Sequence, residues 1–525
     1  MAVLTLSNAA DTQFVWLPDL FQYDINDPNV SIQGTTSPNS VTLATQTPAG
    51  AVLITVTGEA FTYFDDGGEE PAWPLSGDVQ SITLAVNGAT WMTVTGLSVE
   101  LTDLDHFIFG WFRFGNFQPG SGFDVFSLML AGNDTINGSD GNDQIIGGRN
   151  TGNDVINAGD GFDFIMADAG NDTIFGGADE DIYSLLQTFF DGTAFRGATV
   201  NLATGRATDS WGGTDVLESI EEVVGSRMTD RFIGSANDET FSGLRGNDRI
   251  DGGAGFDFVS FDRDMEFGGQ LGTVVNLAQG RATDGWGNTD RLTGIEGAIG
   301  GSARDSFTGD GADNYFSGGG GQDVFRGGGG RDMVDFWRDN VQSGAVVSLA
   351  RSSGQVRNDG YGNVETLVSI EDLWGTRLAD NFTGSGGANG LFGDAGDDTL
   401  VGGGGDDTLE GGVGSDRLTG GAGADSFRFS TRFAEGDPWG DTITDFTRGT
   451  DRLSFVVDDF EGMDGTPRVQ NGTTAGTAGE SWFYFDDATD RLFWDADGIG
   501  GQDAVLVARL IGVSALSASD FDLIA

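Results

Sequence analysis

The chain has 525 residues, of which 88 are glycine, 81 are Asp or Glu and 26 are Lys or Arg, and its formal net charge is −55. All 26 cations are arginine, and cysteine is absent. This charge argues against nucleic acid and anionic membranes as partners, because both need a basic surface. Without cysteine, and with a single histidine (His106), thiolate sites and imidazole clusters are excluded. A bound metal would therefore be a hard cation held by oxygen atoms.

Residues 1–128 predict an N-terminal antiparallel β-sandwich, because short alternating runs such as 51–57 and 81–86 are bounded by turn residues. A stretch of aromatic residues, 107–117, is expected to be buried against the first coil of the region that follows. The alternative is a docking surface for another subunit, the cell envelope or a glycan. We expect no catalytic residues here, although an acid pair of the kind used in glycoside hydrolysis is the alternative.

From residue 134 onward, a carboxylate or its amide counterpart recurs every nine residues in four arrays, with one two-residue insertion at 150–151. The registered positions are Asp134, Asp143, Asp154, Asp163, Asp172 and Asp181; Asp230, Glu239, Asp248 and Asp257; Asp305, Asn314, Asp323 and Asp332; and Asp380, Asn389, Asp398, Asp407, Asp416 and Asp425.

Two residues after each of these 20 positions the side chain is apolar or aromatic in every case. The best copies, such as 402–410, place glycine at the first, second and fourth positions. The unit is therefore G-G-x-G-x-D-x-U-x, where U is apolar.

This motif resembles the calcium-binding nonapeptide repeat of the RTX family of secreted bacterial proteins, over about residues 130–429. The resemblance implies a parallel β-roll or β-helix in which six residues form a turn and three form a strand with its middle residue inward. Two repeats then complete one circuit, so that carboxylates 18 residues apart become neighbours.

Neighbouring carboxylates of such a stack lie about 4.8 Å apart. Their repulsion is roughly 3 kcal/mol per pair at an effective dielectric constant near 20. We therefore expect Ca²⁺ between adjacent circuits, completed by turn carbonyl groups to the six to eight oxygen ligands that it prefers. Magnesium suits these turns less well, because it demands octahedral geometry and gives up water reluctantly.

Neighbours along the stack make 12 potential sites, and roughly 6–12 Ca²⁺ ions are expected. The predicted ligands are Asp134, Asp143, Asp154, Asp163, Asp172, Asp181, Asp248, Asp257, Asp323, Asp332, Asp398, Asp407, Asp416 and Asp425. The strongest pairs are expected to be 134/154, 143/163, 154/172, 163/181, 398/416 and 407/425. Sites that include the other registered positions should be weaker or empty.

A longer period of 75 residues is superimposed on the repeats, so array one (129–183) is followed by three modules (184–429) that contain arrays two to four. The intervening coil segments each carry an acid two residues before an aromatic residue: Asp209, Asp284 and Asp359. We interpret these acids as structural, and a ligand site is the alternative.

Residues 430–525 predict a β-rich C-terminal cap, similar to the domain that follows the roll in serralysin-type proteases. The protease motif H-E-x-x-H is absent, because it needs two histidines. Asp495, Asp497 and Asp503 are expected to be surface turn acids, with one further calcium loop as the alternative. Because no cleaved N-terminal signal is expected, the family resemblance implies export through the type I secretion machinery, read from the acidic and apolar ending 520–524.

The sequence thus predicts an extracellular or cell-surface all-β protein without a transmembrane segment, whose roll folds on calcium after export. The expected role is non-catalytic, as a surface-layer, matrix or adhesive protein with Ca²⁺, itself or cell-surface glycans as partners. The alternative is a secreted hydrolase with catalysis in the N-terminal domain and the roll as an export and folding device.

Overall fold

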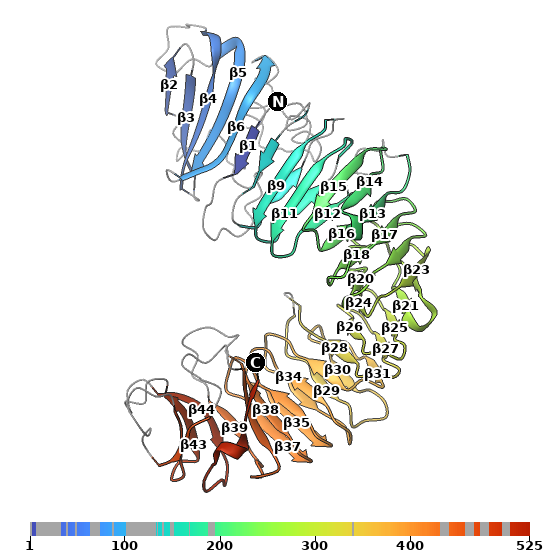
Figure 1. Ribbon diagram of the computed structural model, residues 1–525, viewed down its shortest axis with the longest axis vertical. Helices are drawn as coiled ribbons and strands as arrows, with labels where there is room; N and C mark the ends of the chain where they lie inside the picture. Colours follow the sequence, from blue (N-terminus) through green and yellow to red (C-terminus); the bar gives the residue numbers. More distant parts are fainter. Residues whose placement is uncertain are drawn as a thin grey trace. The chain divides into compact units, whose positions relative to one another are not determined.

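The computed structural model describes residues 3–6, 33–37, 40–47, 50–63, 74–86, 89–100, 133, 135–138, 141–146, 152–166, 168–186, 195–338, 341–430, 440–456, 467–472, 482–495 and 504–524 (Figure 1). The chain divides into two compact units, Met1–Asp257 and Phe258–Ala525, which are described in turn. Almost all of the regular structure is β-strand, so the predicted all-β class is confirmed.

The first unit begins with one antiparallel sheet of strands paired in the order β2-β3-β4-β5-β6-β1. The strands are β1 (Val3–Leu6), β2 (Gln33–Ser37), β3 (Ser40–Thr47), β4 (Gly50–Tyr63), β5 (Pro74–Val86) and β6 (Ala89–Glu100). The alternating runs 51–57 and 81–86 lie in β4 and β5. The second sheet of the predicted sandwich is not among the described residues, and neither are His106 and the stretch 107–117. These parts stay predictions.

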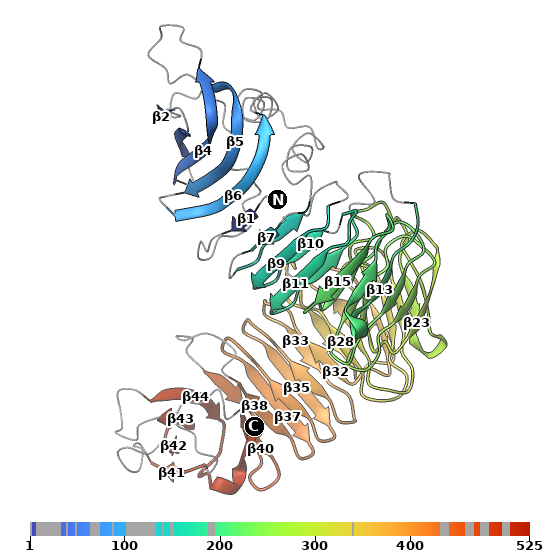
Figure 2. The same ribbon diagram turned by 45° about the horizontal axis from the view of Figure 1, so that its top comes forward.

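The repeat region follows directly, because β1 also pairs in parallel with β7, with Val3 opposite Thr135. The strands of array one are β7 (Thr135–Asn137), β8 (Gln144–Ile146), β9 (Val155–Asp160), β10 (Phe164–Met166), β11 (Thr173–Ala178) and β12 (Ile182–Ser184). Figure 2 shows β7, β9 and β11 side by side.

These strands alternate between two parallel sheets. Val155 lies opposite Thr173 in one sheet, and Phe164 lies opposite Ile182 in the other. Both pairs are 18 residues apart, as the predicted two-repeat circuit requires. The middle residue of each strand points inward and is at most 3% exposed: Ile136, Ile145, Ile156, Ile165, Ile174 and Tyr183. The nine-residue period therefore produces the parallel roll.

Glycine is required where successive circuits come closest. A Cβ on Gly177 would lie 1.6 Å from the carbonyl oxygen of Gly159, and the φ of Gly177 is +129°. A side chain would meet backbone there and would also be strained by the positive φ.

The first coil segment inserts an antiparallel meander into one of the two sheets. The strands are β13 (Thr199–Asn201), β14 (Arg206–Thr208), β15 (Thr214–Glu218), β16 (Glu222–Val224), β17 (Arg231–Ile233), β18 (Thr240–Ser242) and β19 (Arg249–Asp251), with the 3-10 helix η1 (Leu202–Thr204) after β13. β15 pairs in parallel with β11 and antiparallel with β14, and β13 pairs in parallel with β17. The other sheet runs on without interruption through β12, β16 and β18.

The second unit repeats this plan twice. Its strands up to the cap are β20 (Phe258–Ser260), β21 (Val274–Asn276), β22 (Arg281–Thr283), β23 (Thr289–Thr293), β24 (Gly297–Ile299), β25 (Ser306–Thr308), β26 (Tyr315–Ser317), β27 (Val324–Arg326), β28 (Met333–Asp335), β29 (Val346–Ser348), β30 (Val356–Asn358), β31 (Thr366–Val368), β32 (Asp372–Trp374), β33 (Asn381–Thr383), β34 (Gly390–Phe392), β35 (Thr399–Gly404), β36 (Thr408–Glu410), β37 (Arg417–Ala422) and β38 (Ser426–Phe429), with η2 (Leu277–Gln279) after β21.

Phenylalanine fills much of the core of this unit. The rings of Phe307 and Phe325, on neighbouring strands β25 and β27, stack with centroids 5.2 Å apart. Phe316 from the opposite sheet lies 5.6 Å from Phe307. All three side chains are at most 1% exposed, so the ring stack bridges the two sheets.

The C-terminal strands continue both sheets of the roll, because β39 pairs with β37 and β40 pairs with β38. The elements are β39 (Asp441–Ile443), β40 (Arg452–Val456), β41 (Val469–Asn471), β42 (Trp482–Asp486), β43 (Arg491–Asp495), β44 (Val505–Leu510), η4 (Ala518–Asp520) and β45 (Phe521–Ile524). The segment expected to act in export forms η4 and β45, and β45 pairs in parallel with β40. No helix among the described residues is long and apolar enough to cross a membrane.

Candidate metal sites in the turns of the roll

The registered acids stack along the two edges of the roll, where each turn meets its strand. Within an array, the first side-chain oxygen of a registered acid accepts the backbone N–H of the registered residue one circuit earlier. Distances are 2.7 Å from Asp143 to Asp163, 2.8 Å from Asp154 to Asp172, 3.0 Å from Asp163 to Asp181, 2.7 Å from Asp398 to Asp416 and 3.0 Å from Asp407 to Asp425. Asp248 and Asp257 accept in the same way from Asp230 and Glu239. At the first acid of each later array the donor is a coil residue instead: Ala198 for Asp230, Thr273 for Asp305 and Ala345 for Asp380. The structure therefore brings together the pairs that the 18-residue spacing predicts.

The second side-chain oxygen separates twelve of the 20 registered positions into two classes. At six of them the second oxygen, Oδ2, is buried and has no hydrogen-bond partner; we call these the open positions. They are Asp163, Asp181, Asp323, Asp332, Asp398 and Asp407. All six were among the predicted ligands.

At six other positions, which we call closed, the backbone N–H of the residue four places earlier donates to the side chain. The donor and acceptor residues are Ser226 and Asp230 (2.7 Å), Ser235 and Glu239 (3.0 Å), Gly301 and Asp305 (3.0 Å), Asp310 and Asn314 (2.9 Å), Thr376 and Asp380 (2.7 Å), and Ser385 and Asn389 (2.6 Å). These are the six positions that the sequence predicted to be weak or empty.

The backbone of the residue four places earlier explains the difference. Before the open positions this residue has a positive φ: Gly159, Gly177, Gly319, Gly328, Asp394 and Gly403. Before the closed positions no residue does. A positive φ turns the N–H away from the acid, and glycine adopts it at no steric cost. This residue is glycine in five of the six open turns and Asp394 in the sixth, and in each its positive φ leaves the second carboxylate oxygen without an internal donor.

Burial makes an isolated negative charge costly in these turns. Burial raises the pKa of Asp398 to about 9, and the neighbouring charges of Asp380 and Asp416 add to the rise. Burial likewise raises the pKa of Asp163 to about 7 and of Asp407 to about 6. The closed Asp380 also has a pKa of about 7 through burial, so what distinguishes an open position is its unbonded oxygen.

Carbonyl oxygens share the space beside the open carboxylates. A Cβ placed on Gly393 would lie 2.1 Å from Oδ2 of Asp398 and 2.4 Å from the carbonyl oxygen of Gly411. Carboxylate and carbonyl oxygens are the ligands that Ca²⁺ prefers. A cation would satisfy the buried oxygen and cancel the repulsion, so the donor set fits calcium.

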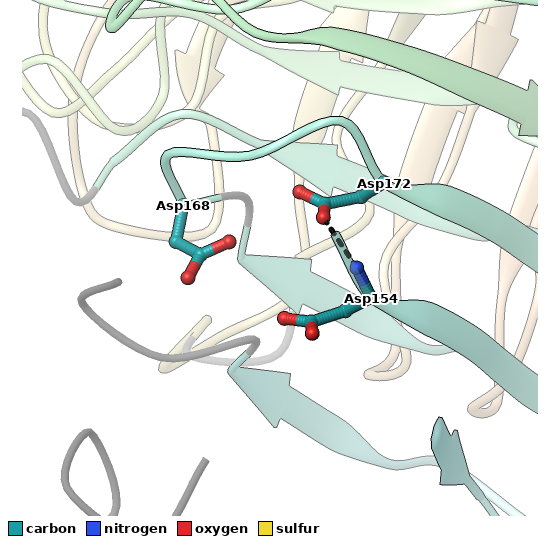
Figure 3. A group of neighbouring side chains, drawn as sticks. All are labelled: Asp154, Asp168 and Asp172. Atoms are coloured by element: carbon teal, nitrogen blue, oxygen red, sulfur yellow. Dashed lines mark hydrogen bonds between the residues drawn. The ribbon is translucent and has the colours of Figure 1, made fainter. Parts of the chain in front are cut away.

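One group of three buried carboxylates includes a residue that sequence reasoning missed. Asp168 lies with Asp154 and Asp172, and one oxygen from each lies within 4.8 Å of the others (Figure 3). Asp168 occupies the second position of its repeat, where glycine is usual. An acid at a position where glycine is usual could have indicated from the sequence that Asp168 is a candidate ligand.

Sequence reasoning also missed the acids that carry the stack across the coil segments. Asp172 donates its N–H to Asp215 at 3.0 Å, and Asp181 donates to Glu221 at 3.0 Å. In the third module Asp332 donates to Glu371 at 3.1 Å. Glu221 precedes Asp230 by nine residues, and Val223, two residues after it, is fully buried. Array two thus begins one repeat earlier than predicted, and the nine-residue spacing already carried that signal.

The remaining expectations divide between described and undescribed residues. Asp134, Asp497 and Asp503 lie outside the described residues, so their roles stay predictions. Asp495 ends β43 and is 1% exposed, which is not a surface turn position. At the cap, the backbone N–H of Asp425 donates to the side chain of Asp451. The backbone N–H of Thr447, four residues before Asp451, donates to the other oxygen of that side chain, so Asp451 has the hydrogen bond of a closed position.

The fold and its turns define a parallel β-roll with stacked, buried carboxylates at the turns. The profile of the RTX calcium-binding nonapeptide repeat (four copies) matches residues 130–150, 149–183, 224–263, 299–334, 374–409 and 401–428. Residues 130–428 therefore carry the calcium-binding nonapeptide repeats of the RTX family. RTX repeats bind calcium and are typical of secreted proteins.

Two solved structures are among those that the comparison matched to the chain. The chain is 32% identical to the AlgE6R3 subunit of the Azotobacter vinelandii mannuronan C5-epimerase, over 27% of this chain and 77% of that one, with a TM-score of 0.20. It is 15% identical to the extracellular lipase LipA from Serratia marcescens, over 95% of this chain and 86% of that one, with a TM-score of 0.17. No protein in the curated set matches significantly.

Proposed function

We propose that the chain is a secreted protein whose roll folds when Ca²⁺ binds outside the cell, and that the loaded roll is a stiff, non-catalytic structural element of a surface layer, matrix or adhesive. The observation that carries this proposal is the open class: six buried carboxylate oxygens without a hydrogen-bond partner, placed beside turn carbonyls. The 14 sequence-predicted acids are the proposed ligands.

The energetic argument favours a calcium switch. If a site of this kind has a Kd of about 0.1 to 1 mM, calcium at ten times Kd stabilises the fold by roughly 1.4 kcal/mol per site. About ten sites would then contribute on the order of 14 kcal/mol, which is comparable with the whole stability of a domain. At the low calcium level of the cytosol the roll would stay unfolded, which suits export as an extended chain.

Export through the type I secretion machinery belongs to the same proposal, with the signal in residues 430–525. The test is to express the chain in a host that carries a type I exporter. The full chain should reach the medium, whereas a variant that lacks 430–525 should stay inside. Equal export of both would contradict this assignment.

The structural role itself is tested by electron microscopy of the secreted protein with and without calcium. Filaments or sheets that form only in calcium support the proposal. The alternative, a secreted hydrolase with its active site in residues 1–128, predicts separate soluble particles and hydrolysis of ester, peptide or glycosidic model substrates. Particles that stay separate and hydrolyse such a substrate would overturn the structural role.

A further inference from the structure

The coil segments of the three modules hold corresponding acids in the same kind of turn. Asp209 Oδ1 accepts the N–H groups of Trp211 at 2.9 Å and of Gly213 at 2.7 Å. Asp284 and Asp359 accept from the corresponding residues, with distances between 2.7 and 2.9 Å. One oxygen of each acid therefore orders the local turn.

The second oxygen differs between the modules. Oδ2 of Asp284 accepts the side-chain amide of Asn288 at 2.7 Å, and Oδ2 of Asp359 accepts that of Asn363 at 2.9 Å. In the first module the corresponding position is Gly213, which has no side chain. Oδ2 of Asp209 is left buried with no hydrogen-bond partner, in a residue that is 0% exposed. An unsatisfied buried carboxylate oxygen is costly, and native proteins normally supply it with a partner.

That oxygen faces the junction between array one and the first coil segment. A Cβ on Gly213 would lie 2.5 Å from Oδ2 of Asp209 and 1.5 Å from the carbonyl oxygen of Gly170. Asp172 at this junction is 2% exposed, and its backbone N–H donates to Asp215, which is 0% exposed. The other oxygen of Asp215 accepts the hydroxyl group of Tyr183 at 2.6 Å, so both oxygens of Asp215 have a partner. Each of these two carboxylates feels the charge of Asp209. None of the three is paired with an arginine in the described part of the chain.

We infer that this junction is a further calcium site, held by Asp209 and Asp172 together with the carbonyl oxygen of Gly170. The site rests on the proposed calcium function, but its Asp209 ligand belongs to the coil segment, outside the nonapeptide repeats. In the second and third modules the amide groups of Asn288 and Asn363 take the place of a cation at the corresponding oxygen. Among the three corresponding acids, Asp209 is therefore the one whose Oδ2 has no amide partner and can bind the ion.

The test is to count bound calcium by native mass spectrometry for the wild type, Asp209→Asn and the matched control Asp359→Asn. Asp209→Asn keeps an oxygen for the turn but replaces Oδ2 with an amide, so it should bind one ion fewer than the wild type. Asp359→Asn should bind the full number, because the amide of Asn363 can rotate and accept. Equal numbers in the wild type and Asp209→Asn overturn the inference. A wild type that binds no calcium overturns the proposed function instead.

A second measurement covers the case in which Asp209→Asn does not fold. Tb³⁺ replaces Ca²⁺ in oxygen sites, and its emission is sensitised by a nearby indole ring. Trp211 follows Asp209 by two residues, so Trp211→Phe in the otherwise native chain should reduce sensitised Tb³⁺ emission. The corresponding Trp286→Phe in the second module should reduce it less. Equal emission from the wild type and Trp211→Phe would contradict a cation at this junction.

Discussion

The residue four places before each registered acid has a positive φ at the open positions and an ordinary φ at the closed ones. At Gly403 the φ is +108°, and at Ser385 the N–H instead donates to Asn389. Turn closure and cation binding are therefore alternatives for the same oxygen. An internal N–H satisfies the side chain without an ion, whereas under the proposed function an open carboxylate needs a bound cation.

The first prediction follows from this alternative. Gly403→Ser should disfavour the positive φ, turn the N–H toward Asp407 and close the position. We expect one calcium ion fewer and a loss of about 1.4 kcal/mol in the calcium-dependent part of the free energy of unfolding, measured in calcium at ten times Kd. Native mass spectrometry and urea denaturation check the two effects.

Its matched control is Gly386→Ser. Gly386 lies in the closed turn before Asn389, has no positive φ, and has open space where a Cβ would stand. This variant should bind the same number of ions as the wild type. If Gly403→Ser also kept every ion, the account of open and closed positions would be wrong.

The second prediction concerns pH in the calcium-free protein. Burial raises the pKa of Asp163 to about 7, of Asp323 to about 8 and of Asp398 to about 9, against about 3.9 in an unfolded chain. Between these values the folded state binds more protons than the unfolded state. The contribution of these carboxyl groups to the stability of the calcium-free fold is therefore fully present below about pH 4 and is lost progressively as pH rises from about 4 to 9.

Calcium competes with these protons, so its affinity should increase with pH over the same range. Circular dichroism of the calcium-free chain should show β structure that declines from about pH 5 to 9. Titrations with calcium at each pH should give a falling Kd. A calcium-free fold that becomes more stable as pH rises would contradict the burial of these carboxyl groups.

At the scale of the element, the nine-residue period alone predicts the short strands, their two sheets and the inward residues. The same period locates Asp398 and Asp407 as candidate ligands, because 18-residue neighbours must meet in such a coil. The period fails in the coil segments, where Asp215 and Glu221 are only six residues apart. An antiparallel meander there sets which acids meet, and pairing across such an insert depends on tertiary structure. The unbonded oxygen of Asp209 could not be predicted for the same reason.

The third prediction concerns the ring stack between the sheets. Phe307→Ala removes a fully buried ring that packs on Phe316 and Phe325, so it should lower the free energy of unfolding of the calcium-loaded protein by about 3–5 kcal/mol. Phe162→Ala is the control, because Phe162 is 56% exposed and should change stability by less than about 0.5 kcal/mol. Urea denaturation in calcium measures both. Similar losses in the two variants would show that the stack is not part of the core.

At the scale of the whole molecule, the net charge of −55 describes the protein without ions. About ten bound Ca²⁺ ions would reduce it to roughly −35, since each adds two positive charges. Under the proposed function, part of the acidic composition is explained by cation sites in the turns, since 18 of the 81 acidic residues occupy registered positions. The remaining negative charge keeps the protein soluble and leaves cation-bridged contacts with other acidic surfaces available.

The central claim is that calcium is required to fold the roll, and a circular dichroism titration of the intact chain tests it most directly. The account predicts little β structure in chelator near pH 8 and a cooperative gain of β structure as calcium rises through about 0.1 to 1 mM. Magnesium at the same concentrations should give a much smaller gain. The same β content in chelator as in millimolar calcium would contradict the claim.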